Sequence, residues 1–218
     1  NLLATGKKGR ASKSAFRQNR EWHSRGYLPH FDHPGLVQSV TFRLADSLPA
    51  EKLEQWHQAL NIAPGAKASC PDGARASCPQ SDNENTEFHR RVEEWLNQGH
   101  GACHLRNPEI AAVVENALLH FDGERYRLIA WTVMPNHVHV VFESFHGFRL
   151  EDVVHSWKSY TAKEANKLLG KKGQFWQEDY FDRYIRDARH LKEVVDYVDH
   201  NPVEAKLVSR AEDWTFGS

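Results

Sequence analysis

Residues Trp131-Thr-Val-Met-Pro-Asn-His137-Val-His139-Val-Val-Phe-Glu143 form an apolar segment that is interrupted by two histidines with one residue between them. Successive side chains of a β-strand point to opposite faces, so His137 and His139 share one face, with Cα atoms roughly 6–7 Å apart. At that spacing two imidazoles can bind one metal ion. The opposite face is apolar and consists of Val138, Val140 and Phe142. We expect this apolar face to cover the core and the histidines to point outward.

A turn signal, Met134-Pro135-Asn136, stands directly before the histidine pair. It places the histidines at the start of their strand, where a ligand can approach them. Glu143 shares their face but lies about 13 Å from His139, at roughly 3.3 Å per residue, which is too far for both to bind one ion. The alternative is that the histidines are surface residues of the strand that bind no ligand.

The composition predicts one main domain without a strong overall charge. Hydrophobic residues make up 40% of the 218 residues, enough for one core of ordinary size, and 28 Lys and Arg stand against 29 Asp and Glu. Residues 1–28 contain seven Lys or Arg and a single acid, Glu21. We therefore expect a basic arm over residues 1–28, either solvated or in contact with phosphates, and one domain over residues 29–218.

The sequence shows no long apolar run and no signal-peptide pattern near its first residue. We therefore expect a cytoplasmic protein without a membrane partner. Because Met134 is the only methionine, we expect the natural start to lie upstream of Asn1. The three cysteines form no CxxC pattern, so we expect free thiols and no disulfide framework.

The remaining patterns predict an α+β domain. The expected elements are strand 36–44, helices 49–62, 87–98 and 107–121, strands 125–134 and 137–144, helix 150–169, strand 180–186 and helix 188–200. Two nearly identical octamers, 65–72 and 73–80, are rich in Gly, Pro and Ser and predict a flexible insertion over about 63–86. The order of elements is close to a ferredoxin-like βαββαβ domain with additional helices. We expect helices to cover one face of its sheet and the other face to be left free to carry a site.

The last helix carries a tyrosine away from its buried face. Its apolar stripe consists of Leu191, Val194, Val195 and Val198. Tyr197 lies about 120° from the centre of that stripe, on the same side as His190 and Asn201. We expect Pro202 to end the helix before Asn201, so that the four-residue spacing from Tyr197 to Asn201 is only approximately helical. The alternative is a tyrosine that packs on the margin of the helix.

These residues together resemble a known family. The motif His137-Val-His139, preceded by Met-Pro-Asn and followed by Tyr197-Val-Asp-His-Asn201-Pro, resembles the single-tyrosine HUH transposases of the IS200-like type, and most closely their REP-associated tyrosine transposase branch. Further similar stretches are Trp22-His-Ser-Arg-Gly-Tyr-Leu-Pro-His30, His120-Phe-Asp-Gly-Glu-Arg-Tyr126, Phe175-Trp-Gln177, Tyr180-Phe-Asp-Arg-Tyr-Ile-Arg-Asp187 and Glu212-Asp-Trp214. The resemblance covers residues 21–214.

The resemblance implies a ferredoxin-like nuclease that cuts and rejoins single-stranded DNA near hairpins. His137 and His139 would hold Mg²⁺ or Mn²⁺, Asn201 would complete the metal shell, and Tyr197 would be the nucleophile that forms a 5′-phosphotyrosine. Neutral imidazoles and an amide oxygen leave the ion its full charge for a substrate phosphate. Because a tyrosine has a reference pKa near 10, either the metal must polarise the phosphate or a neighbour such as His190 must help to take the proton.

Several cations stand where they can contact DNA phosphates. The candidate DNA-binding residues are Arg25, Lys158, Lys163, Trp176, Arg183 and Arg186. Trp176 would stack on a base or, alternatively, fill the core, and the lysines can also form a plain solvated face. The resemblance implies single-stranded or hairpin DNA as the partner and association with the nucleoid, and we expect a monomer or homodimer.

Two other function classes fit parts of the pattern. A non-catalytic module that binds single-stranded or hairpin nucleic acid would have the same fold, but it would need stacking aromatics on the open face of the sheet. A metal-dependent hydrolase would use water as its nucleophile and form no covalent adduct.

Overall fold

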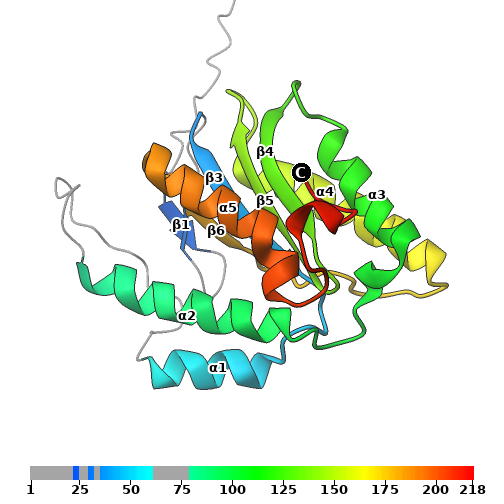
Figure 1. Cartoon of the computed structure of the whole chain (residues 1–218), viewed down its shortest axis with the longest axis horizontal. Coiled ribbons are helices and arrows are strands. Elements are labelled where there is room, and N and C mark those ends of the chain that lie inside the picture. Colours follow the sequence, from blue (N-terminus) through cyan, green and yellow to red (C-terminus); the bar gives the residue numbers. More distant parts are fainter. Residues whose placement is uncertain (1–21, 25–28, 32–34, 61–78) are drawn as a thin grey trace, which may run out of the picture.

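The computed structural model describes residues 22–24, 29–31, 35–60 and 79–218 of the chain (Figure 1). The strands are β1 (Trp22–Ser24), β2 (Pro29–Phe31), β3 (Val37–Arg43), β4 (Tyr126–Val133), β5 (His137–Ser144) and β6 (Phe181–Tyr184). The helices are α1 (Ala50–Ala59), α2 (Pro79–Asn97), α3 (Pro108–Leu119), α4 (Leu150–Leu168) and α5 (Ala188–Glu204), with 3₁₀ turns η1 (His104–Arg106) and η2 (Ala211–Asp213). Most of the predicted basic arm, including Arg25, and residues 65–78 of the octamers lie outside the described residues.

Four strands form one antiparallel sheet in the order β4-β5-β3-β6. With the helices between them, they make the ferredoxin-like βαββαβ arrangement with additional helices, and the predicted α+β fold is confirmed. β5 is a central strand, so its side chains are flanked on both sides by β3 and β4. Among the described residues, none of the helices combines the length and apolar character that crossing a bilayer requires.

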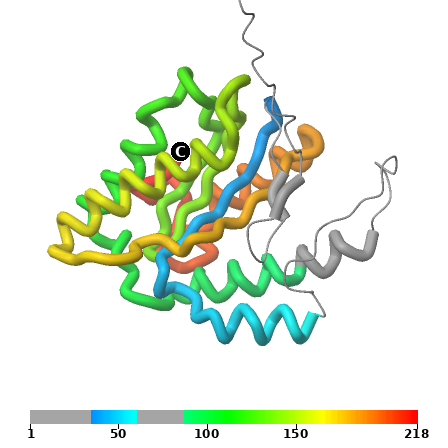
Figure 2. Tube along the Cα trace, turned by 180° about the vertical axis from the view of Figure 1, so that it is seen from behind, coloured from blue at the N-terminus to red at the C-terminus, as the bar shows by residue number. Residues whose placement is uncertain are grey.

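The helices α3 and α4 cover one face of the sheet (Figure 2). α3 begins where the sequence predicts, because the Asn107 side-chain oxygen accepts a hydrogen bond from the Glu109 N–H at 3.0 Å and Pro108 takes the first helical position. The apolar side of β5, which includes Val138, Val140 and Phe142, packs against these two helices in the main core. The prediction that this side of β5 faces the core is therefore correct.

The other face of the sheet is not free, contrary to the prediction. α5 crosses it (Figure 1), and Val198 of this helix packs on Ala130 of β4 and Val141 of β5 in a second apolar cluster. The apolar stripe of α5 needs a partner surface, and Val141 on the histidine face of β5 supplies part of it. The histidine face is therefore an interior layer between the sheet and α5.

α5 also continues past the predicted end, through Asn201 and Pro202 to Glu204. A proline inside a helix removes one backbone N–H donor. Here both residues are buried, and the helix continues beyond the proline because the Ala205 N–H donates to the Asn201 carbonyl at 2.9 Å. Packing has thus outweighed the local preference, and Asn201 lies a full helical turn after Tyr197.

α2 begins at Pro79, inside the predicted flexible insertion of residues 63–86. Pro at the first helical position, followed by acidic residues, is a favourable helix start. The predicted insertion therefore extended too far at its C-terminal end. α1 and α2 lie side by side at one end of the sheet in both views (Figures 1 and 2). Their shared apolar cluster includes Phe88, Val92 and Leu96 of α2.

A buried hydrogen-bond chain joins α3, β4 and α4. The Tyr126 hydroxyl donates to the Leu118 carbonyl at 2.7 Å and accepts from the Trp157 indole N–H at 2.9 Å. Tyr126→Phe leaves the Trp157 N–H without a partner in the core, so we expect it to lower the free energy of unfolding by about 1–3 kcal/mol. Urea denaturation measures this change, with Tyr160→Phe as a control because Tyr160 is 54% exposed. Equal stability of the two variants would contradict this role of Tyr126.

Candidate active site

His137 and His139 point toward each other from the start of β5. Their Nε2 atoms are 3.0 Å apart. On the far side of each ring, the His137 Nδ1 lies 2.7 Å from the Asn136 side-chain oxygen, and the His139 Nδ1 lies 2.8 Å from the Thr41 hydroxyl of β3. Hydrogen bonds to the outer ring nitrogen fix the orientation of a metal-binding histidine. The two Nε2 atoms are thus held in place to bind one ion.

Both histidines are buried, with exposed fractions of 0% for His137 and 1% for His139. The prediction that they point outward was wrong, because α5 and α2 close over their face of the sheet. The prediction that they share one face was correct. The strand period determined their common direction, whereas the covering helices could not be inferred from the strand itself.

Glu93 of α2 joins the histidine pair, although the sequence did not indicate it. Its Oε2 lies 3.3 Å from the His139 Nε2, and one ligand atom from each of Glu93, His137 and His139 lies within 4.8 Å of the others. Glu93 follows the buried Val92 on an amphipathic helix, which was the only local sign of its position. Its side chain is 21% exposed, so the cluster meets the solvent at this carboxylate.

The protonation states suit metal binding. Burial acts to raise the pKa of the Glu93 carboxyl, but His139, His137 and the hydrogen bond from Tyr197 outweigh it and hold the pKa at about 2. Burial, assisted by His139, lowers the pKa of His137 to about 3. At neutral pH, Glu93 is therefore a carboxylate and His137 a neutral imidazole, the forms that donate electron pairs to a cation.

Tyr197 of α5 reaches the same cluster. Its hydroxyl donates a hydrogen bond to the Glu93 Oε2 at 3.1 Å, and its ring lies edge-on to the His139 ring at 5.6 Å between centroids. Burial raises the pKa of the Tyr197 phenol above its usual value, and the charge of Glu93 raises it further, while Asn201 opposes the change. The hydroxyl is thus held protonated beside the candidate metal ligands.

Asn201 and His190 flank Tyr197 on α5 at unequal distances. Asn201 lies one turn later and is fully buried, and neither atom of its amide makes a hydrogen bond to a described residue. His190 lies about two turns earlier, or about 10 Å along the helix. Its Nδ1 accepts a hydrogen bond from the Arg186 N–H at 3.2 Å. The structure thus brings Asn201, but not His190, toward the Glu93–histidine cluster.

The predicted DNA-binding cations lie on both sides of the sheet. Arg183 and Arg186 are exposed, and the pairing of β6 with β3 turns Arg183 to the face that carries the histidines. Lys158 and Lys163 belong to α4, on the opposite face. The Lys158 Nζ donates to a backbone carbonyl at 2.6 Å, whereas Lys163 is exposed. Arg25 lies outside the described residues.

Trp176 is part of the core. Its ring packs edge-on against Phe42 at 4.8 Å between centroids, and its indole N–H donates to the Thr161 hydroxyl at 2.9 Å. Of the two alternatives for Trp176, burial favours the core residue over a platform for a base. Glu143 likewise has a structural partner, since its carboxylate pairs with Arg127 at 2.7 Å.

The donor set fits a divalent cation. One carboxylate and two imidazoles converge, and the amide of Asn201, buried one helical turn after Tyr197, has no hydrogen-bond partner among the described residues. Buried polar groups normally have partners, so this amide fits the role of a further ligand. Oxygen and imidazole donors together suit Mn²⁺ well and Mg²⁺ less strongly.

Comparison with known proteins finds a transposase family that resembles this chain in the segment with the candidate site. The family model described as "Transposase IS200 like" matches residues 108–201. This segment contains His137, His139, Tyr197 and Asn201, and the resemblance seen in the sequence is confirmed. Glu93 lies outside the matched segment, on α2.

Two curated relatives are REP-associated tyrosine transposases. The protein of Escherichia coli (strain K12) is 26% identical over 107 residues, which are 49% of this chain and 62% of the relative. The putative one of Haemophilus influenzae (strain ATCC 51907 / DSM 11121 / KW20 / Rd) is 22% identical over 103 residues, 43% of this chain and 58% of the relative. The chain thus covers less than two thirds of the length of either IS200-like relative.

Solved structures give weaker similarities. A REP-associated tyrosine transposase bound to a REP hairpin is 18% identical, with a TM-score of 0.48 over 87% of this chain and 80% of the other. A putative transposase from Deinococcus radiodurans R1 is 13% identical, with a TM-score of 0.34 over 82% of this chain and 96% of the other.

We expect Mn²⁺ to stabilise the protein through Glu93, His137 and His139. A ligand at a concentration of roughly 100 times its Kd raises the free energy of unfolding by about 2.7 kcal/mol. Thermal unfolding with and without Mn²⁺ should show a clear rise in Tm for the natural protein and a much smaller rise for Glu93→Gln, which removes the charge of the carboxylate. Glu143→Gln, on the same face of the sheet, is the control and should keep the full rise. A full Mn²⁺ effect in Glu93→Gln would exclude Glu93 as a ligand.

Proposed function

We propose that this protein is an IS200-like transposase that cuts and rejoins single-stranded DNA near hairpins, with Tyr197 as its nucleophile. The observation that carries the proposal is the position of Tyr197. Its hydroxyl donates a hydrogen bond to the candidate metal ligand Glu93, and its ring lies edge-on to the His139 ring. A tyrosine that merely filled the core would not need a carboxylate at its hydroxyl and an imidazole beside its ring. REP-associated relatives, one of them described with a bound REP hairpin, support hairpin DNA as the substrate class.

Glu93, His137 and His139, with the amide of Asn201, would hold Mg²⁺ or Mn²⁺. When bound, the cation would neutralise charge on the scissile phosphate and make its phosphorus easier to attack. The protein residues prepare this chemistry by their fixed orientation. Thr41 and Asn136 hold the outer nitrogens of the two rings, so that the inner nitrogens stay directed at the cluster.

The chemical step is a transesterification. The Tyr197 Oη forms a bond to the phosphorus, and the bond from phosphorus to the 3′-oxygen of the preceding nucleotide breaks. The phenol proton passes to the Glu93 carboxylate, which already accepts its hydrogen bond, and the leaving 3′-oxygen takes a proton from solvent to become a hydroxyl. Glu93 thus replaces His190 as the candidate proton acceptor, because His190 lies about two helical turns from Tyr197.

The product is a 5′-phosphotyrosine and a free 3′-hydroxyl. The number of phosphoester bonds does not change, because one ester bond forms as the other breaks. Attack by a 3′-hydroxyl on the tyrosine-bound phosphate therefore rejoins DNA without a nucleotide cofactor. Water as the nucleophile would give a hydrolase, and the absence of a reaction would leave a hairpin-binding protein that no longer cuts.

Incubation with hairpin DNA that has single-stranded flanks, in the presence of Mn²⁺, should yield a protein–DNA adduct that survives denaturing electrophoresis. Tyr197→Phe should abolish the adduct, since phenylalanine has no oxygen to attack phosphorus. Tyr160→Phe is the matched control, because Tyr160 is exposed on α4 across the sheet. Cleavage without any adduct would indicate the hydrolase, and DNA binding without cleavage would indicate the non-catalytic protein.

A further inference from the structure

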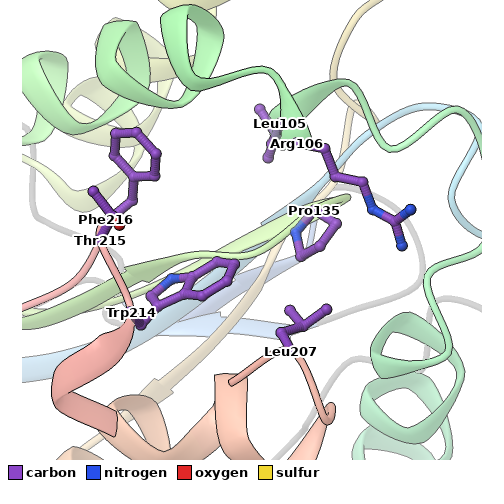
Figure 3. Close-up of a pocket in the computed structure, with 7 residues that line it drawn as sticks. All are labelled: Leu105, Arg106, Pro135, Leu207, Trp214, Thr215 and Phe216. Carbon is purple, nitrogen blue, oxygen red and sulfur yellow. The ribbon is translucent and has the colours of Figure 1, made fainter. Parts of the chain in front are cut away.

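A cavity of about 310 Å³ lies at the end of the sheet where β4 ends and β5 begins (Figure 3). Three separate segments build it: η1, the turn before β5, and the chain that follows α5. Its wall includes Leu105, Arg106, Pro135, Leu207, Trp214 and Phe216. The volume is at the lower end of the range for small-ligand sites, which suits one compact ligand.

The cavity lies close to the candidate active site along the chain. Pro135 forms part of its wall, and the Pro135 carbonyl accepts a hydrogen bond from the Leu105 N–H at 3.1 Å. The next residue, Asn136, holds the His137 Nδ1. A ligand in the cavity therefore sits beside the turn that positions the first histidine.

The cavity wall suits a flat ring. Pro135 and Leu207 supply apolar surface, and the Trp214 indole extends along the cavity (Figure 3). The Trp214 N–H is itself buried, so a ligand in the cavity meets the indole ring and not this donor. Stacking on an aromatic side chain is available to every base.

The charges at the cavity favour a phosphate-bearing ligand. Arg106 lines the cavity and is exposed, and Lys206, next to Leu207, is exposed as well. Neither cation forms an ion pair with another residue in the described part of the chain. The two acids before Trp214 do not cancel them, because Glu212 and Asp213 both pair with Arg210. One cation, Arg106, therefore lines a mostly apolar cavity, and a second, Lys206, is next in sequence to Leu207 of its wall.

We infer that this cavity binds one unpaired nucleotide of a single-stranded DNA substrate, with the base against Trp214 and a neighbouring phosphate on Arg106. The inference rests on the proposed function, since it assigns part of the same DNA to a second place on the protein. The bound nucleotide fixes the position of the strand relative to Tyr197. It thereby determines which phosphate meets the nucleophile.

The test measures DNA binding without cleavage, in protein that carries Tyr197→Phe. The probe is a DNA hairpin with unpaired flanks, in which one flanking nucleotide at a time is replaced by an abasic site. One position should weaken binding by about tenfold when its base is removed, because the stack on Trp214 is lost. Leu207→Trp fills the cavity, so it should weaken binding of the intact probe and remove the penalty at that position.

Arg106→Gln is a second variant that does not disturb the core, because Arg106 is exposed. It should weaken binding of every probe, whereas the control Arg127→Gln, at the opposite end of β4, should not. Circular dichroism confirms that each variant is folded. A flat abasic scan, or a penalty that persists in Leu207→Trp, would overturn the cavity as a nucleotide site while leaving the proposed function intact. Failure of the Tyr197→Phe protein to bind any hairpin would overturn both.

Discussion

The alternation of side chains along β5 determines where the core and the candidate site lie. Its apolar side packs against α3 and α4, which leaves His137, His139 and Val141 on the other side together. Val141 then binds the apolar stripe of α5, and this contact carries Tyr197 to the histidines. A shift of β5 by one residue would exchange the two sides and place valines at the site. Core packing and the candidate chemistry therefore depend on the same strand register.

Glu93 belongs to α2, which lies outside residues 108–201, the segment that the transposase family model matches. α2 is held by its own apolar cluster with α1, and from there its carboxylate reaches both His139 and Tyr197. The same carboxylate can thus serve as a metal ligand and as the acceptor of the phenol proton. The side chain of Glu93 is also partly exposed, so α2 borders the solvent-facing side of the candidate site.

Local patterns were sufficient for the fold and for part of the site. The period of two in residues 137–143 and the helical period around Asn107 depend on neighbours in sequence, and the structure confirms both. Glu93 could not be identified in this way, since its partners lie 44 or more residues away and an acid beside a buried helix face is usually solvated. Pro202 misled for a similar reason: its local effect ends a helix, but burial of Asn201 and Pro202 keeps α5 intact.

The attachment point of DNA on the protein bears most directly on the role of Tyr197. The denaturant-resistant adduct can be digested with trypsin and nuclease, and the peptide that retains a nucleotide can be sequenced by mass spectrometry. The peptide that follows Lys192 and ends at Lys206 should carry the added mass on Tyr197, joined through the 5′-phosphate of the nucleotide. A nucleotide on another tyrosine, or one joined through its 3′-phosphate, would contradict Tyr197 as the nucleophile of this transesterification.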